Sequence, residues 1–102
     1  MVIDLYVNYV DGVPSDEFVG TIYKSSNDTY RLNFTFDVSP TQIYLNYMLP
    51  DETGNTNPIL ITQEYLIPDE LTDLEGDLLI TLTLVDGNQR LFTRPIHLEI
   101  RE

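Results

Sequence analysis

The chain has 102 residues, a length typical of one domain, and 42% of them are hydrophobic, which is too apolar a composition for a disordered protein. Seventeen acidic residues against five basic ones give a formal charge of −12, which disfavours contact with nucleic acid and with anionic membrane surfaces. The chain has no cysteine, so disulfides and thiolate metal ligands are excluded. We therefore expect one domain over residues 1–102, with no nucleic-acid or membrane partner, that is stabilised by its hydrophobic core.

The first half of the chain contains four segments that are expected as strands, three of them with clear alternation and one, residues 18–23, short. Residues 2–10, 18–23, 30–36 and 41–48 are predicted as strands, because a period of two places alternate side chains on opposite faces of a sheet. The apolar face of the first segment consists of Ile3, Leu5, Val7 and Tyr9. The fourth segment has bulky residues on both faces, so this strand is expected either to be covered on both sides or to contribute to an interface.

The middle of the chain contains the weakest strand signals. Residues 49–58 include two prolines, a glycine and several polar turn-forming residues, which predicts the longest loop. A short strand is expected over residues 59–62. After Pro68, residues 69–74 could form one helical turn with acidic side chains near its positive N-terminal end. The stretch from 65 to 76 is therefore the only candidate for structure other than strand.

The C-terminal part is predicted as a hairpin. Residues 76–85 alternate, and the Asp86-Gly87 pair favours the positive φ angles of a tight turn. Pro95 cannot donate a ladder hydrogen bond, so the returning strand is expected at a sheet edge or bulged at that position. The side chains expected to point inward on this strand are Phe92, Ile96, Leu98 and Ile100. Those expected to point outward are Thr93, His97, Glu99 and Arg101.

The chain lacks the residue combinations that catalysis requires. His97 is the single histidine and is expected on an outward face, where a solvated side chain is the ordinary interpretation. The serines fall in loops without a glycine-flanked elbow. We expect neither an enzyme nor a cofactor. The acidic residues between 69 and 77 leave a loop calcium site open as an alternative to a solvated loop, although their spacing does not match an EF-hand: Asp69, Asp73, Glu75 and Asp77.

Tyrosine is the most suggestive residue type for binding. There are seven tyrosines, and two of them, Tyr6 and Tyr44, are expected on strand faces opposite the core. Exposed aromatic side chains can anchor a protein interface or stack on sugars, but they can also simply cover the second face of a sheet. The interface residues that the sequence predicts are Tyr6, Tyr44, Pro95 and His97.

The order of strands and turns follows a known plan over nearly the whole chain. An opening strand, a polar loop and an alternating strand correspond to residues 3–10, 24–28 and 30–36. A middle strand enters a Pro-Asp-x-x-Gly turn, here Pro50 to Gly54. The closing half has an acidic stretch ending in glycine, a strand, an Asp-Gly turn and a last strand: 69–76, 78–85, 86–87 and 92–100. In this order the chain resembles the N-terminal domain of the baseplate upper protein family, found in phages of Gram-positive bacteria.

The short strands, separated by turn signals about every ten residues, favour an all-β sandwich or small barrel. The resemblance implies an immunoglobulin-like antiparallel β-sandwich of about seven to eight strands, without an active site. It also implies a phage virion structural or adaptor protein of the tail tip or baseplate, made in the host cytoplasm. Its expected partners are other phage structural proteins, with homo-oligomers within a symmetric assembly. The alternative is a carbohydrate-binding or adhesion module that decorates a phage or bacterial surface.

Overall fold

The computed structural model describes residues 1–102, which form ten strands and one short 3-10 helix. In chain order the elements are β1 (Val2–Val10), β2 (Val13–Pro14), β3 (Phe18–Tyr23), β4 (Thr29–Phe36), β5 (Gln42–Met48), β6 (Ile59–Ile61), β7 (Glu64–Leu66), η1 (Asp69–Leu71), β8 (Gly76–Asp86), β9 (Gln89–Phe92) and β10 (Ile96–Arg101).

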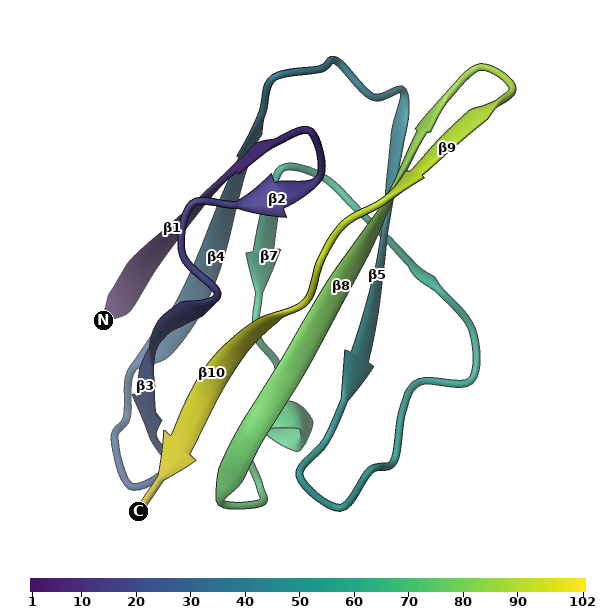
Figure 1. The fold of residues 1–102 in the computed structure, drawn as a ribbon. Coiled ribbons are helices and arrows are strands. Elements are labelled where there is room, and N and C mark those ends of the chain that lie inside the picture. Colours follow the sequence, from purple (N-terminus) through teal and green to yellow (C-terminus); the bar gives the residue numbers. More distant parts are fainter.

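The strands form two sheets that pack face to face as a sandwich (Figure 1). The first sheet has the order β2-β1-β4-β7, and the second has the order β3-β10-β8-β5-β6, with β9 also paired to β8. The predicted all-β sandwich is confirmed. Both sheets are mixed, because β1 runs parallel to β4 and β3 runs parallel to β10, whereas the family resemblance implied an antiparallel sandwich.

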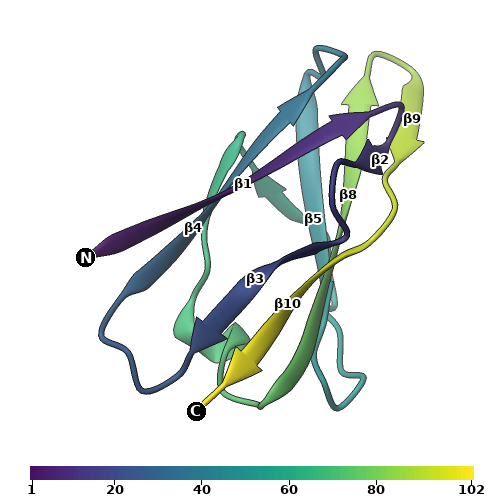
Figure 2. The ribbon, with the colours of Figure 1, turned by 60° about the vertical axis from the view of Figure 1, so that its left-hand side comes forward.

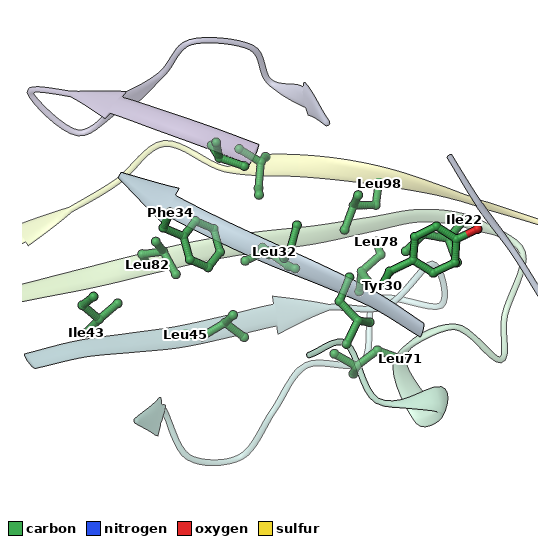
Figure 3. Packing of buried hydrophobic residues seen from close by; sticks show 14 of the residues in the cluster. Ile22, Tyr30, Leu32, Phe34, Ile43, Leu45, Leu71, Leu78, Leu82 and Leu98 are labelled. Atoms are coloured by element: carbon green, nitrogen blue, oxygen red, sulfur yellow. The ribbon is translucent and has the colours of Figure 1, made fainter. Parts of the chain in front are cut away.

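The core lies between the two sheets and is built by the predicted alternation. Seventeen buried residues form one continuous cluster to which both sheets contribute. Side chains from β4 fill the space toward β5, β8 and β10, as Figure 3 shows for Leu32 and Phe34. Burying one such aliphatic or aromatic side chain contributes about 1.5–3 kcal/mol, so this cluster stabilises a chain that has no disulfide.

The structure tests two expectations for the middle of the chain, the helical turn after Pro68 and the departure from strand over residues 65–76. The expected helical turn is present as η1, and its Leu71 side chain is buried in the core. The stretch 65–76, the candidate for structure other than strand, also includes the end of a short strand, because β7 pairs with β4 through Leu66 opposite Arg31 and Tyr65 opposite Leu32. Since β7 is only three residues long, no alternation could reveal it.

The last strand departs from its prediction at residues 93–95. Phe92 is 71% exposed and Thr93 is buried, the reverse of the predicted faces. The cause is an interruption between β9 and β10 that shifts the alternation by one residue. Pro95 lies in this interruption, so the predicted irregularity is present there. The edge location is wrong, because β10 lies between β3 and β8.

Candidate interaction surface

The outer face of the second sheet has an unusual composition. Cross-strand pairs place side chains side by side there: Tyr44 opposite Thr83, Asn46 opposite Thr81, and Met48 opposite Leu79. Strands β6, β9 and β10 add further outward residues opposite these. We call this surface the neutral face, and its members are Tyr44, Asn46, Met48, Leu60, Leu79, Thr81, Thr83, Phe92, Pro95 and His97.

The ten residues of the neutral face include no carboxylate, although 17 of the 102 residues of the chain are acidic. Charged residues border it on the same outer face: the cross-strand pair of Glu99 and Asp77 follows His97 and Leu79, and Arg90 lies beside Thr83. Several of its side chains are large, apolar and accessible: Phe92 is 71%, Leu60 is 61% and Met48 is 44% exposed. A sheet face that only meets water normally alternates to polar and charged side chains. Exposed apolar side chains grouped in this way are characteristic of surfaces that bind another molecule.

The neutral face also contains two shallow hollows that could receive side chains of a partner. One lies over β5 and β8 beside the interruption, and its lining residues are Asn46, Tyr47, Met48, Leu79, Thr81 and Pro95. The other is smaller, and its lining residues are Tyr44, Pro58, Thr83 and Arg90. In the second hollow the Tyr44 hydroxyl donates to Gln42 Oε1 at 3.2 Å, which orients the phenol ring along the strand.

His97 extends the neutral face toward β3. Its ring centroid lies 5.3 Å from that of Phe18, with 43° between the ring planes. Phe18 lies opposite His97 in the parallel pair and is 42% exposed. The predicted outward orientation of His97 is therefore correct, and its neighbour is an aromatic ring.

Tyr6 lies on the other side of the molecule, on the outer face of the first sheet, and is 75% exposed. Nearby on this face, Arg31 donates from Nε and Nη2 to the two carboxylate oxygens of Asp4, at 2.6 and 3.1 Å. These hydrogen bonds, followed by one from Asn33, hold the pKa of the Asp4 carboxyl below its usual value. The sequence thus predicted residues of two surfaces: Tyr44, Pro95 and His97 belong to the neutral face, and Tyr6 does not.

Seven of the ten members of the neutral face were not among the predicted interface residues, and four of these seven have large apolar side chains: Met48, Leu60, Leu79 and Phe92. Met48 lies in the segment 41–48, whose bulky residues on both faces predicted either a strand covered on both sides or an interface. That pattern did not single out Met48 as an interface residue. Leu79 lay in the alternating segment 76–85, on the face opposite Leu78 and Ile80, but was not connected to an interface. Leu60 lay in a short apolar run whose orientation depends on strand pairing. Phe92 was placed on the inner face, because the interruption at residues 93–95 could not be located from alternation alone.

The acidic stretch between η1 and β8 does not form a metal site. No three or more His, Cys, Asp or Glu side chains of the chain converge as ligands of one ion. The four carboxylates proposed for calcium are spread over η1, the following loop and the start of β8. No helix in the structure is long and apolar enough to cross a membrane.

No protein-family model matches this chain, and no curated protein matches its sequence at a significant level.

Proposed function

We propose that this chain is a non-catalytic structural or adaptor protein of a phage virion, at the tail tip or baseplate, and that it acts through protein–protein contacts. The observation that supports a contact role is the neutral face. It offers accessible apolar side chains on a protein whose net charge is −12, with the nearest carboxylates of that sheet face, Glu99 and Asp77, at its border. Repulsion between like charges is therefore weakest where this face meets a partner.

The size and shape of the neutral face suit a flat protein partner. It extends over strands β6, β5, β8, β9 and β10, with Phe92 and Leu60 as its most exposed apolar side chains. Aromatic residues and methionine are enriched in interface cores, and charged residues are depleted there. The shallow hollows beside Tyr44 and Pro95 would receive anchoring side chains from the partner.

The assignment to a phage tail rests on the sequence plan. The succession of strands and turns resembles the N-terminal domain of the baseplate upper protein family, and the chain is an all-β sandwich, as this resemblance implied, although its two sheets are mixed. The proposed partners are other structural proteins of the same virion.

The test is a binding measurement with the tail-tip and baseplate proteins encoded near this chain. We expect a stable complex by light scattering after size-exclusion chromatography. Phe92→Glu would put a carboxylate on the neutral face, and we expect it to weaken this complex at least tenfold. The matched control is Leu66→Glu, because Leu66 is, like Phe92, an exposed apolar residue in a strand, 54% exposed, but lies on the first sheet.

Two results would contradict the proposal. In one, the chain binds none of the neighbouring tail proteins. In the other, Phe92→Glu and Leu66→Glu weaken the complex equally, which would place the contact elsewhere. Circular dichroism of both variants would establish that each remains folded.

Carbohydrate binding has weaker support. Its expected feature was a patch lined by tyrosines, but Tyr6 and Tyr44 lie on the outer faces of opposite sheets and cannot line one patch. The small hollow beside Tyr44, with Arg90 at its wall, has a combination of a ring and polar groups that can bind sugars. Binding on a glycan array that is lost in Tyr44→Ala would favour this function over the first.

A further inference from the structure

The outer face of the first sheet carries one exposed tyrosine ring among polar side chains. Strands β1 and β4 run side by side in the same direction (Figure 2), and three of their cross-strand pairs face outward: Asp4 with Arg31, Tyr6 with Asn33, and Asn8 with Thr35. Strand β7 adds Glu64 beside Asn33. We call these seven residues the Tyr6 platform. Neighbouring strands lie about 4.8 Å apart, so Tyr6, Asn33 and Glu64 form one row across three strands, about 10 Å wide.

The polar side chains of the Tyr6 platform hold one another in place. Besides the two hydrogen bonds from Arg31, the Asp4 carboxylate accepts one from Asn33 Nδ2 at 3.0 Å. The Thr35 hydroxyl donates to Asn8 Oδ1 at 2.8 Å. The pKa of Arg31 is raised mainly by its hydrogen bonds to Asp4, with smaller contributions from the nearby side chains of Glu64 and Tyr6. The groups around the Tyr6 ring are therefore ordered before a ligand arrives.

This network leaves three hydrogen-bonding groups of the platform unused. The Arg31 Nη1 amino group and the Asn8 Nδ2 amide are donors without a partner in the protein, and Asn33 Oδ1 is an acceptor without one. They surround a ring that is 75% exposed. A side chain that is already fixed in position loses little conformational entropy on binding. The platform thus offers ordered donors and an ordered acceptor beside an accessible aromatic face.

A sugar ring matches this combination better than a protein surface does. A pyranose has an apolar C–H face that stacks on an aromatic ring, and its hydroxyls both donate and accept hydrogen bonds at the edge of that face. The core of a protein interface is depleted of charged residues. Around Tyr6, in contrast, the Asp4–Arg31 ion pair lies on one side and Asn8 on the other. The surroundings of the ring are therefore those of a saccharide site.

The charges of the platform indicate the class of saccharide. The Asp4 carboxylate is neutralised by Arg31, whereas no cation pairs with Glu64, on a chain whose net charge is −12. An anionic sugar is therefore repelled by the platform and by the protein as a whole. A neutral sugar is not repelled, and its hydroxyls can donate to the Glu64 carboxylate.

A cleft beside the platform provides room for further sugar units. It has a volume of about 770 Å³, and Arg31 and Glu64 of the platform form part of its wall. The rest of the wall comes from strands β6 and β7 and the start of β5, and includes Ile59, Ile61 and Tyr65. Clefts that bind small molecules have volumes of about 300–1,000 Å³. An oligosaccharide with one ring on Tyr6 would therefore continue over Arg31 and Glu64 into this cleft.

We propose that the Tyr6 platform binds a neutral saccharide, with one sugar ring stacked on the Tyr6 side chain. The hydroxyls of this ring bond to the unused groups of Arg31, Asn33 and Asn8, and the next sugar unit bonds to Glu64. The site lies on the opposite sheet from the neutral face and from the hollow beside Tyr44. It does not depend on the proposed contact with tail proteins.

The first experiment is an NMR titration of the ¹⁵N-labelled chain with neutral oligosaccharides of glucose, galactose and N-acetylglucosamine. Sugar concentrations reach about 20 mM, so binding with a Kd of about 1 mM is detected. We expect shifts of backbone amides in β1 and β4 and of the side-chain amides of Asn8 and Asn33. Sialylated and sulfated oligosaccharides should bind at least tenfold more weakly.

Three results of this titration would overturn the proposal. In the first, none of the neutral oligosaccharides shifts any resonance. In the second, an anionic oligosaccharide binds as tightly as the neutral ones or more tightly. In the third, the shifts cluster on β5 and β8, which would place the sugar in the hollow beside Tyr44.

The second experiment tests the role of the Tyr6 ring. Tyr6→Ala removes the stacking surface, and we expect it to raise the Kd for the best neutral oligosaccharide at least tenfold. Tyr23→Ala is the matched control, because Tyr23 is also an exposed strand tyrosine, 49% exposed, but lies on the second sheet. Asn8→Ala removes one unused donor without touching the Asp4–Arg31 pair, and should raise the Kd about threefold. Equal affinities of Tyr6→Ala and Tyr23→Ala, both folded by circular dichroism, would overturn the proposal.

These experiments are distinguishable from the test of the tail-protein contact. Sugar binding that is lost in Tyr6→Ala but kept in Phe92→Glu supports the Tyr6 platform, whether or not a tail protein binds. Conversely, a tail-protein complex that is lost in Phe92→Glu, in a chain that binds no neutral sugar, supports the neutral face and overturns the saccharide site.

Discussion

Thr93 and Leu82 are joined by two hydrogen bonds of 2.9 Å, although Thr93 lies outside any strand. The Thr93 N–H donates to the Leu82 carbonyl, and the Leu82 N–H donates to Thr93 Oγ1. The side-chain oxygen thus takes the place of the backbone acceptor that a regular strand would supply. This substitution lets the chain shift its alternation between β9 and β10 without leaving the Leu82 N–H unpaired, and it leaves Phe92 on the neutral face.

Removing this hydroxyl should destabilise the fold. Thr93→Val keeps the shape of the side chain but leaves the buried Leu82 N–H without an acceptor, which costs about 1–3 kcal/mol. Thr93→Ser keeps the acceptor and loses one methyl group, so its cost should be smaller, about 0.8 kcal/mol. Urea denaturation of the three proteins measures the difference. Equal losses in the two variants would show that the hydroxyl does not have this role.

The same interruption makes a prediction about the two residues before it. Leu91 packs against the core and Phe92 faces solvent, the reverse of the predicted alternation. Leu91→Ala should lower the free energy of unfolding by roughly 2 kcal/mol, the low end of the range for truncating a core leucine, because the Leu91 side chain is only partly buried. Phe92→Ala should change it by less than about 0.5 kcal/mol. If Phe92→Ala lowers the melting temperature more than Leu91→Ala does, the sequence prediction that Phe92 points inward would be correct instead.

These residues also show how far the sequence determines the fold. Alternation predicted β1, β4, β5 and β8 with the correct inward faces, because a long strand repeats its pattern several times. It could not predict the parallel pairing of β1 with β4, since the same alternation fits either direction. It also could not locate the irregular step at Thr93, where a side chain replaces a backbone acceptor and the pattern shifts by one residue.

The candidate surface was predictable only in part, for a related reason. Tyr44 and His97 were recognised as outward residues because each lies in an alternating strand. Whether outward residues share a surface depends on which strands pair, and only the structure shows this. It brings Tyr44, His97 and Pro95 onto one sheet and places Tyr6 on the other. Single-residue reasoning therefore found members of the neutral face but not the face itself.

Substituting Tyr9 should stabilise the protein, whereas most substitutions in a protein core destabilise it. Its ring stacks on Phe36 with centroids 5.6 Å apart, and its buried hydroxyl makes no hydrogen bond of standard geometry, although the nearby Thr93 side chain partly offsets the rise that burial causes in its pKa. A buried polar group without a partner is unfavourable. Tyr9→Phe keeps the ring and should stabilise the protein by up to about 1 kcal/mol. A loss of more than 1 kcal/mol in chemical denaturation would mean that the hydroxyl has a partner in solution.

The ionisation of Tyr9 gives a separate expectation for alkaline pH. Burial raises the pKa of Tyr9 above its ordinary value of 10.0. Above about pH 10 the unfolded chain loses this proton while the folded chain keeps it, so stability falls as the pH rises. Burial also raises the pKa of Tyr65, so Tyr9→Phe should reduce this fall without removing it. Unfolding curves at pH 8 to 11 for both proteins measure the effect, and identical slopes would contradict it.

Gly76, at the start of β8, is required by both its backbone angle and its surroundings. Its φ is +126°, and an added Cβ would lie 2.9 Å from Cβ of Pro50 in the long loop. Gly76→Ala should therefore destabilise the protein by at least about 1–3 kcal/mol. Gly20→Ala is the matched control, since its Cβ would lie at an ordinary 3.5 Å from Leu5 Cδ2. That variant should be neutral or slightly more stable, because alanine restricts the unfolded chain. Equal melting temperatures for the two variants would show that the loop at Pro50 moves aside readily.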